Sequence, residues 1–378
     1  MSGENMELFY SDSALLKYKV ITPLYNKYNQ DDKKYDEFPK GIHAELYEKD
    51  GSMVGSITSK YAKKLEEEML WELRNEVVVI NAEGKKLETD LMYWDMKKEI
   101  VYTLKGLYRE DFNIEGYRFG SGERSACIVG ALRGNEMQQL YICSQLINTL
   151  KNLEAHGAIT HNHEIFVIPC ANSFSLNIGK RFWALDNVDI NRTFPGDIHG
   201  DATKQISASI FERVKGYNYG IQFASFYMQG DFIPHVRMME TGFQSASLAN
   251  LFGLPYVVIR RPKPMDTATL NYNWQMNGTN AFSIYTNSTD TIDEHSARQA
   301  VSSVLRFLTR MGIVKYNNHS GYIASVVNES DLHCVKSYDA GFYKRYKAPG
   351  DYVSHGECIA EVVDPYEGYI KSQIISQT

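Results

Sequence analysis

The architecture of the chain is decided by two stretches, Gly130-Ala-Leu-Arg-Gly-Asn-Glu136 and Asp189-Ile-Asn-Arg-Thr-Phe-Pro-Gly196. The first follows a short apolar run at residues 128–129 and precedes residues 136–156, where apolar side chains recur at helical spacing. A buried strand that leads through a glycine-containing turn into an amphipathic helix is typical of α/β proteins. The sequence therefore predicts strand, turn and helix here.

Further strands and helices are predicted to alternate up to residue 316. Short apolar runs at residues 165–169, 256–259 and 282–284 are typical of buried strands, and a second helix is expected at residues 293–311. Helices that alternate with strands pack as layers on a sheet. Residues 104–316 are therefore predicted to form an α/β domain.

The order of these motifs resembles the succinylglutamate desuccinylase/aspartoacylase family, which has a zinc carboxypeptidase-like fold. In that family the first motif reads Gly-x-His-Gly-x-Glu, and its His and Glu bind zinc. The resemblance implies that Arg133 stands at the His position and that Glu136 remains as the Glu. It also implies that Ala224, in Gly220-Ile-Gln-Phe-Ala-Ser225, stands at the third ligand, and that Tyr285 stands at the general-base Glu.

These substitutions remove most of the family's zinc chemistry. A guanidinium has no free lone pair and stays protonated, so Arg133 cannot bind a cation. A catalytic zinc site takes about three protein ligands and an open position for water, and Glu136 alone remains of the three. Tyr285 cannot readily replace a carboxylate base, because its reference pKa is about 10. We therefore expect a pseudoenzyme of a zinc hydrolase family with no cofactor, and zinc only if other residues bind it.

The residues that hold substrate in the family are kept. Arg181, Asn191 and Arg192 match side chains that bind the carboxylate and amide of an acyl-amino acid, and His235 matches a segment near the family's pocket. Guanidinium groups match carboxylates in two-point geometry, so this set remains chemically coherent without zinc. With Arg133 it is predicted to bind a small carboxylate or an N-acyl amino acid, its charge standing in for the metal.

Two alternatives to zinc-free binding stay open. The arginines also fit a purely structural network of ion pairs with Asp186, Asp189 and Glu136. The second alternative is an active metal-dependent amidohydrolase whose metal site is not recognised from its sequence.

Residues 1–103 show extended runs broken by turn dipeptides, notably at residues 44–51 and 76–89, which predict hairpins in one all-β sheet. Their motifs resemble the periplasmic lipopolysaccharide-export family LptC: Tyr10-Ser-Asp-Ser13, Lys17-Tyr-Lys-Val20, Glu37-Phe-Pro-Lys-Gly41, Trp71-Glu-Leu-Arg-Asn75 and Tyr93-Trp-Asp95. That resemblance implies a bent sheet that cradles lipid acyl chains, with a lipid or an Lpt-system protein as partner. An ordinary small β sandwich is the alternative.

Residues 317–378 are predicted to form a small C-terminal β domain, because β segments with Gly and Pro punctuation follow Tyr316, including residues 348–353 and 356–363. It resembles the β domain that follows the catalytic domain in the desuccinylase family, but it ends early. A truncated sheet has an unpaired edge, which favours a homo-oligomer. The junction at 103–104 fits a natural fusion, a misassembled reading frame or an engineered chimera.

Composition limits the partners. The chain has 378 residues, a net charge of −6 and a pI of about 6.0, which gives no general attraction to nucleic acid. Its apolar stretches are too short for a membrane span, and its N-terminus lacks the features of a signal peptide. We expect a cytoplasmic protein as written, or a periplasmic one if the LptC-like segment dominates and an upstream signal is missing.

Overall fold

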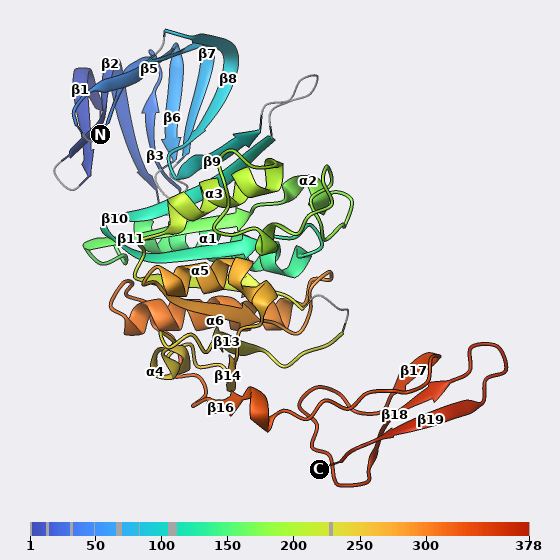
Figure 1. Ribbon diagram of the computed structural model, residues 1–378. Helices are drawn as coiled ribbons and strands as arrows, with labels where there is room; N and C mark the ends of the chain where they lie inside the picture. Colours follow the sequence, from blue (N-terminus) through green and yellow to red (C-terminus); the bar gives the residue numbers. More distant parts are fainter. Residues whose placement is uncertain are drawn as a thin grey trace. The chain divides into compact units, whose positions relative to one another are not determined.

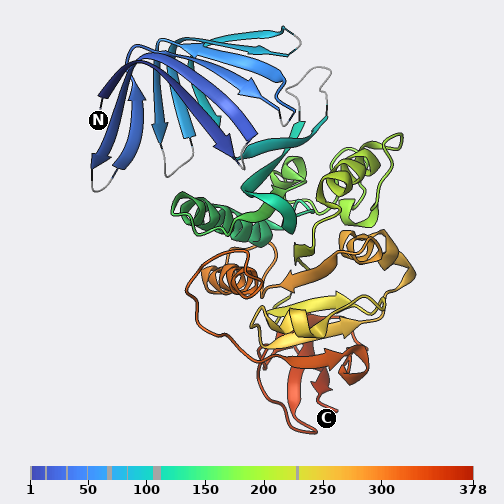
Figure 2. The same ribbon diagram turned by 90° about the vertical axis from the view of Figure 1, so that its left-hand side faces the viewer.

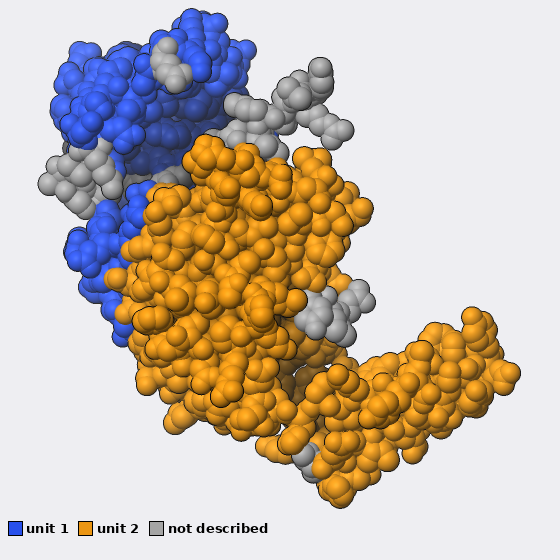
Figure 3. Space-filling view, viewed as in Figure 1, with its two compact units in different colours: residues 1–127, 144–168, 308–317 blue, residues 128–143, 169–307, 318–378 orange. Residues whose placement is uncertain are grey.

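The computed structural model describes residues 2–12, 15–30, 33–48, 50–65, 70–82, 84–104, 112–226 and 230–377. It divides into two compact units, which are coloured in Figure 3. Unit 1 comprises residues 1–127, 144–168 and 308–317, and unit 2 comprises residues 128–143, 169–307 and 318–378. The N-terminal antiparallel sheet lies within unit 1.

The N-terminal part of unit 1 is one antiparallel sheet, drawn in blue in Figure 1 and visibly curled in Figure 2. Its strands are β1 (Ser2–Asp12), β2 (Leu15–Gln30), β3 (Lys33–Phe38), β4 (Ile42–Tyr47), β5 (Met53–Ser59), β6 (Tyr61–Leu65), β7 (Leu70–Asn81) and β8 (Lys86–Asp95). The predicted hairpins are present as β4–β5 and β7–β8. Gly51 and Gly84 turn them with φ of 83° and 78°, a backbone region that favours glycine.

Aromatic side chains fill the interior of this sheet. The rings of Phe38 and Trp71 stack at 5.2 Å, and those of Tyr10 and Tyr18 stack at 4.4 Å. On β7, Val77 is fully buried in the cluster whereas Ile80 is 39% exposed, as expected of a strand with two unlike faces. The sheet-rich N-terminal region is thus confirmed. The LptC resemblance stays a prediction, and so does the boundary at 103–104, which adjoins residues 105–111 outside the described residues.

The remaining elements of unit 1 include parts of three that have residues in both units. They are β9 (Lys98–Leu104), most of β10 (Phe112–Ala131), the C-terminal part of α1 (Met137–Ala155) and most of β11 (Asn162–Cys170). The ammonium of Lys97 lies 2.7 Å from the Glu154 carboxylate, and that of Lys151 lies 2.9 Å from Asp95. The helix predicted at 136–156 and the strand predicted at 165–169 are confirmed.

Unit 2 contains a mixed sheet with the order β12-β15-β13-β14-β16, in which only the β13–β15 pairing is antiparallel. Its strands are β12 (Tyr219–Ala224), β13 (His235–Met239), β14 (Tyr256–Arg260), β15 (Asn280–Tyr285) and β16 (Ser325–Asn328). Its helices, beside the start of α1, are α2 (Ser173–Leu176), α3 (Ala202–Val214), α4 (Ala246–Asn250), α5 (Leu270–Met276) and α6 (Glu294–Arg310), with 3-10 turns η1 (Ile190–Arg192), η2 (Pro264–Ala268) and η3 (Glu329–Asp331).

Packed aromatic rings join the helices to this sheet. Phe307 of α6 lies 5.4 Å from Phe282 of β15 and stacks at 4.3 Å on Phe252, which follows α4. All three side chains are essentially inaccessible to solvent. The mixed α/β architecture is therefore confirmed, including the helix predicted at 293–311 and the strands predicted at 256–259 and 282–284.

A separate three-stranded antiparallel sheet ends the described chain: β17 (Phe342–Arg345), β18 (Cys358–Val363) and β19 (Ile370–Ile375). The β segment predicted at 356–363 is confirmed, but the one predicted at 348–353 is wrong. There the N–H of Asp351 donates to the Ala348 carbonyl at 3.1 Å, which closes a turn instead of extending a strand. In the described ranges, no helix has the length and apolar composition that crossing a membrane requires.

Candidate functional site

Two rows of side chains on one face of the unit 2 sheet form the floor of the candidate site. In one row, Gln222 of β12 lies beside Ser283 of β15, which lies beside Arg237 of β13. Residues in register on neighbouring strands point to the same face of a sheet. A polar row therefore crosses three strands.

The second row lies two residues along each strand and faces the same way. It runs from Ala224 through Tyr285 to His235. The rings of His235 and Tyr285 are parallel within 2° and stack at 4.9 Å. Two positions that the sequence singled out, Ala224 and Tyr285, are thus brought side by side.

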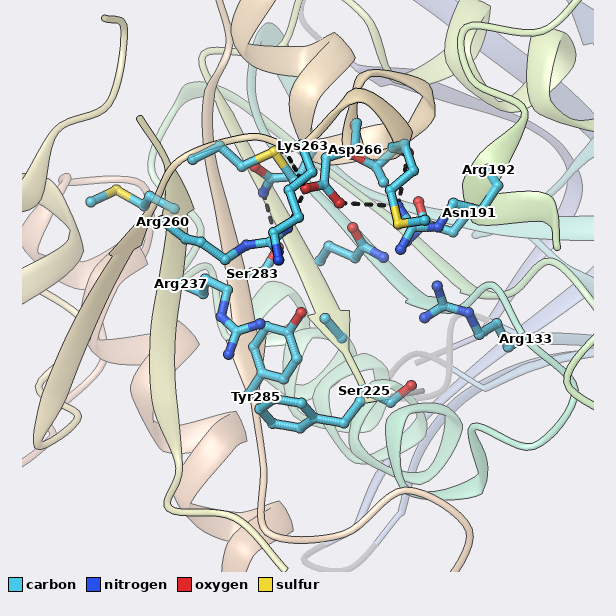
Figure 4. A pocket seen from close by; sticks show the side chains of 18 of the residues that line it. Arg133, Asn191, Arg192, Ser225, Arg237, Arg260, Lys263, Asp266, Ser283 and Tyr285 are labelled. Atoms are coloured by element: carbon cyan, nitrogen blue, oxygen red, sulfur yellow. Dashed lines mark hydrogen bonds and ion pairs between the residues drawn. The ribbon is translucent and has the colours of Figure 1, made fainter. Parts of the chain in front are cut away.

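A cavity of about 480 Å³ lies over these rows, within unit 2. It is shown in Figure 4 and is rich in basic side chains. Its polar and charged lining residues are Arg133, Arg181, Asn191, Arg192, Gln222, Ser225, Arg237, Arg260, Lys263, Asp266, Thr269, Asn271 and Ser283. Four of the five predicted substrate-binding residues therefore meet in one cavity; the fifth, His235, is not among those that line it.

Arg133 is held at the cavity wall by two carboxylates. Its Nε donates to both oxygens of Asp189, at 3.1 and 3.0 Å, and its Nη1 donates to Glu136 at 3.2 Å. Burial disfavours the charged guanidinium, but attraction to Glu136 and Asp189 outweighs burial and raises the pKa of Arg133. The side chain is therefore a fixed cation, only 5% exposed.

Glu136 is fully occupied as a hydrogen-bond acceptor. One carboxylate oxygen accepts the backbone N–H groups of Leu132 and Arg133, at 2.9 and 3.0 Å. The other accepts the Arg133 guanidinium and the Ser225 hydroxyl, the latter at 2.5 Å. A carboxylate offers about four acceptor positions, and four donors fill them here.

The lone pairs of the Glu136 carboxylate accept hydrogens from protein groups, the guanidinium of Arg133 has no lone pair for a cation, and the Ala224 side chain has no donor atom. Among the residues that the structure describes, no group of three or more His, Cys, Asp or Glu side chains could hold a metal ion.

Asp189 connects two of the predicted binding residues. Its carboxylate accepts from Arg181 Nη2 at 2.7 Å, in addition to Arg133, and from the backbone N–H of Asn191 at 3.0 Å. Burial raises the pKa of Asp189, but the two guanidinium groups more than offset burial and leave its pKa lowered. Asp189 is therefore the ionised centre of this cluster. The alternative of a structural network of ion pairs agrees with the structure in part, because Asp189 and Glu136 form ion pairs with arginines.

Asn191 and Arg192 are oriented by contacts with the opposite wall. The Asn191 side-chain oxygen accepts the N–H of Leu270 at 3.0 Å, which ties η1 to the first residue of α5. The Arg192 guanidinium donates to the Met265 carbonyl at 2.9 Å and to Asp266 at 3.1 Å. Asp266, far along the sequence, is therefore the partner of Arg192, and Asp186 is not.

His235 is a buried neutral imidazole. Its Nδ1 lies 2.7 Å from the Ile233 carbonyl, so Nδ1 carries the hydrogen and donates it. Burial, aided by the positive charge of Arg237, lowers the pKa of His235 to about 4. The imidazole ring of His235 stacks against the ring of Tyr285 and helps to hold it in place.

Sequence reasoning missed four charged residues of the cavity: Arg237, Arg260, Lys263 and Asp266. A signal for Arg237 was present, because strand alternation places residue 237 on the same face as His235. Arg260 and Asp266 form an ion pair with each other, and Asp266 also accepts the backbone N–H of Lys263 at 2.8 Å. Nothing in the sequence connects these residues to Arg192, because long-range contacts depend on tertiary packing.

Comparison with known proteins identifies the domain type. Residues 123–310 match the family model described as the succinylglutamate desuccinylase/aspartoacylase catalytic domain. No curated protein sequence matches the chain. A succinylglutamate desuccinylase from Silicibacter sp. TM1040 has a similar structure, with a TM-score of 0.61 and 18% identity over 74% of this chain and 85% of that one.

Two further solved structures show the same fold. The succinylglutamate desuccinylase/aspartoacylase from Rhodobacter sphaeroides has a TM-score of 0.59 at 16% identity, and covers 71% of this chain and 83% of its own. The product-bound ectoine utilization protein EutE (DoeB) from Ruegeria pomeroyi has a TM-score of 0.59 at 19% identity, and covers 70% and 81%. These likenesses show a shared fold, and membership of the family is supported by the match of residues 123–310 to the family model.

Proposed function

We propose that this chain, whose residues 123–310 match the succinylglutamate desuccinylase/aspartoacylase catalytic domain, binds a small carboxylate or an N-acyl amino acid without zinc. In this proposal it is a catalytically degenerate relative of those hydrolases. The observation that carries the proposal is the ion pair between Arg133 and Glu136, which puts a protein cation on the one zinc ligand that remains of the family pattern.

Free donors in the cavity support binding of an acid group. The ion pairs of Arg133 use its Nε and Nη1 atoms, and its Nη2 has no bonding partner among the described residues. The hydrogen bonds of Arg192 use Nη1 alone, and its guanidinium is partly exposed. Each arginine therefore keeps N–H groups for a carboxylate, and charge-assisted bonds of this kind are roughly twice as strong as neutral ones.

In this proposal, the described residues that line the cavity include none that could carry out hydrolysis. Hydrolysis of an amide requires an activated water and a group that takes up its proton near neutral pH. Tyr285 faces the cavity beneath Arg237, and a phenol is a poor general base near neutral pH. We therefore expect binding without turnover.

Zinc content is the first test. We expect purified protein to retain no stoichiometric zinc after zinc loading and desalting, as measured by elemental mass spectrometry. One tightly held zinc per chain would instead favour the metal-dependent amidohydrolase. A chelator such as EDTA is expected to leave the thermal midpoint unchanged, since the fixed charge of Arg133 does not dissociate.

Ligand binding is the second test, by titration calorimetry with N-acyl amino acids and dicarboxylates. If no ligand of the set shows measurable binding at millimolar concentration, the proposal is refuted. For any ligand that binds, Arg192→Gln is expected to weaken affinity by about 10- to 100-fold, the worth of a charge-assisted hydrogen bond. Arg261→Gln is the matched control, because Arg261 is exposed, pairs with Glu240 and is not among the cavity residues.

A further inference from the structure

Apolar side chains line the cavity beside its arginines. They are Ala224, Phe226, Met238, Met239, Met265 and Tyr285. The cavity volume of about 480 Å³ lies within the range of about 300–1,000 Å³ that is usual for pockets that hold drug-sized ligands. A small carboxylate such as acetate fills only part of that volume. The apolar lining is therefore available to a larger and less polar part of the ligand.

The second row of the floor contains one short side chain, Ala224. It is in register with Tyr285 on the neighbouring strand, so the two side chains point to the same face of the sheet. A methyl group is far shorter than a phenol, and the floor therefore drops from Tyr285 to Ala224. Because Ala224 lines the cavity and is only 5% exposed, the hollow above its methyl group lies deep in the cavity.

Two aromatic rings stand beside Ala224 and are held in place by other rings. Phe226 lies two residues further along the chain, and its ring centre is 4.7 Å from that of Tyr285. The Phe226 ring stacks on Phe232 at 3.7 Å, and the Tyr285 ring stacks on His235 at 4.9 Å. Rings that are already packed lose little further freedom when a ligand binds. The hollow therefore has preorganised apolar walls.

The hollow adjoins the cationic cluster of the cavity. Ser225 directly follows Ala224, and its hydroxyl donates to Glu136, which also accepts from Arg133. In Figure 4, Arg133 and Tyr285 lie on opposite sides of the cavity. A ligand whose carboxylate binds at Arg133 can therefore place another group against Ala224. A polar group there would lose water without a hydrogen bond from the methyl group, so an apolar group is favoured.

We propose that the hollow at Ala224, walled by Phe226 and Tyr285, is an apolar subsite for the acyl group of an N-acyl amino acid. The carboxylate of that ligand binds at Arg133 and Arg192, so this inference rests on the proposed function. The cavity prefers acids with a bulky apolar acyl group, such as benzoyl, over the same acids with an acetyl group. Ala224 is thus a specificity-determining residue, because a larger side chain at this position fills the hollow.

The experiment is titration calorimetry on the full chain with two matched pairs of ligands. N-benzoylglycine is compared with N-acetylglycine, and N-benzoylalanine with N-acetylalanine, since the members of each pair differ only in the acyl group. The wild type is expected to bind the benzoyl member of at least one pair about tenfold or more tighter, because the phenyl ring buries more apolar surface. Ala224→Leu is expected to reduce that ratio to within about twofold.

Two further variants control for structure. Ala246→Leu introduces the same side chain on α4, where Ala246 is only partly buried and is not among the cavity residues, so the wild-type ratio is expected. Ala224→Val fills the hollow only in part, so an intermediate ratio is expected. Thermal melting establishes that each variant is folded, and Ala224→Val decides the test should Ala224→Leu fail to fold.

The outcomes separate the subsite from the proposed function. If the wild type binds both members of each pair equally, or if the Ala224 variants keep the full preference, the apolar subsite is refuted and the proposed function stands. If neither these ligands nor the wider set of N-acyl amino acids and dicarboxylates binds the wild type, the proposed function fails and the subsite fails with it. Binding of dicarboxylates alone refutes the apolar subsite and leaves the proposed function standing.

Discussion

At the scale of single residues, Arg133 is the cation that two buried carboxylates of the site share. It sits against Glu136 and Asp189, and all three are at least 95% buried. A buried charge that loses its partner keeps the cost of desolvation and loses the attraction that offset it. The effect of a substitution here is therefore set by the groups left behind.

Arg133→Met is expected to destabilise the protein by about 3–5 kcal/mol, because it leaves two buried carboxylates short of a countercharge. Urea unfolding measures the change. The exposed Arg261→Gln is expected to stay within about 0.5 kcal/mol of wild type. A loss below 1 kcal/mol for Arg133→Met would mean that the network contributes little.

His235 predicts a pH dependence. Its folded pKa is about 4, below the unfolded value of about 6.5, so the unfolded chain takes up a proton in this window that the folded chain does not. Stability is therefore lost as the pH falls from about 6.5 towards 4. The variant His235→Phe keeps a ring against Tyr285 and serves as the reference. Between pH 8 and pH 5, the free energy of unfolding of the wild type is expected to fall by on the order of 2 kcal/mol more than that of the variant.

Thermal or urea unfolding of both proteins across that pH range tests this expectation. Parallel stability curves for wild type and His235→Phe would contradict it. Asp189 does not confuse the result, because its lowered pKa places its titration below the window.

At the scale of elements, the starts of α1 and α6 are joined by one side chain. The Gln138 amide donates to the carbonyl of Asp293 at 3.0 Å and accepts the N–H of the same residue at 2.9 Å. The backbone N–H of Gln138 also donates to Thr289 at 3.0 Å. The loop that presents Arg133 and Glu136 directly precedes α1, so this joint helps to fix the cavity wall.

Gln138→Ala is expected to cost about 1–3 kcal/mol, since it leaves the backbone N–H of Asp293 without its partner and removes one of the two hydrogen bonds to the Asp293 carbonyl, which keeps that from the Ala297 N–H. Chemical unfolding gives the free energy, and hydrogen exchange should show lost protection at the start of α6. Gln145→Ala is the control on the same helix, where the side chain is exposed. If the two variants have the same free energy of unfolding and the same hydrogen exchange, the contact between Gln138 and Asp293 does not stabilise the start of α6.

The elements were predicted best where periodicity is strong. The helices α1 and α6 and the strands β14 and β15 follow from apolar spacing alone, because each buries one face or a short run. The predicted β segment at residues 348–353 failed, since Pro349 lacks an N–H and the adjoining Gly350 has a φ of 96°, which suits a turn. Arg237 and Asp266 entered the site through strand pairing and chain reversal, which local patterns do not encode.

At the scale of the whole molecule, the N-terminal sheet has a hydrophobic cluster of its own. Trp71 is fully buried in the unit 1 sheet, where it packs on Phe38, whereas the cavity is lined by unit 2 residues alone. Stability of the first unit and ligand binding by the second should therefore respond to different substitutions.

Trp71→Ala is expected to destabilise the N-terminal sheet by about 3–5 kcal/mol, the usual cost of removing a large buried aromatic side chain. Hydrogen exchange should quicken in β2, β3 and β7, while ligand affinity measured by calorimetry stays within about twofold of wild type. A matching loss of affinity would show that the units are energetically coupled.

The saturated carboxylate of Glu136 has a consequence for redesign. To build a metal site around Glu136, its carboxylate would have to be released from the Ser225 hydroxyl and from the Arg133 guanidinium. Replacing Arg133 first leaves two buried carboxylates without their countercharge, so the loss of stability comes before any metal can bind. The fixed cation therefore makes stepwise conversion to a metal site costly, and such a redesign has to change several residues at once.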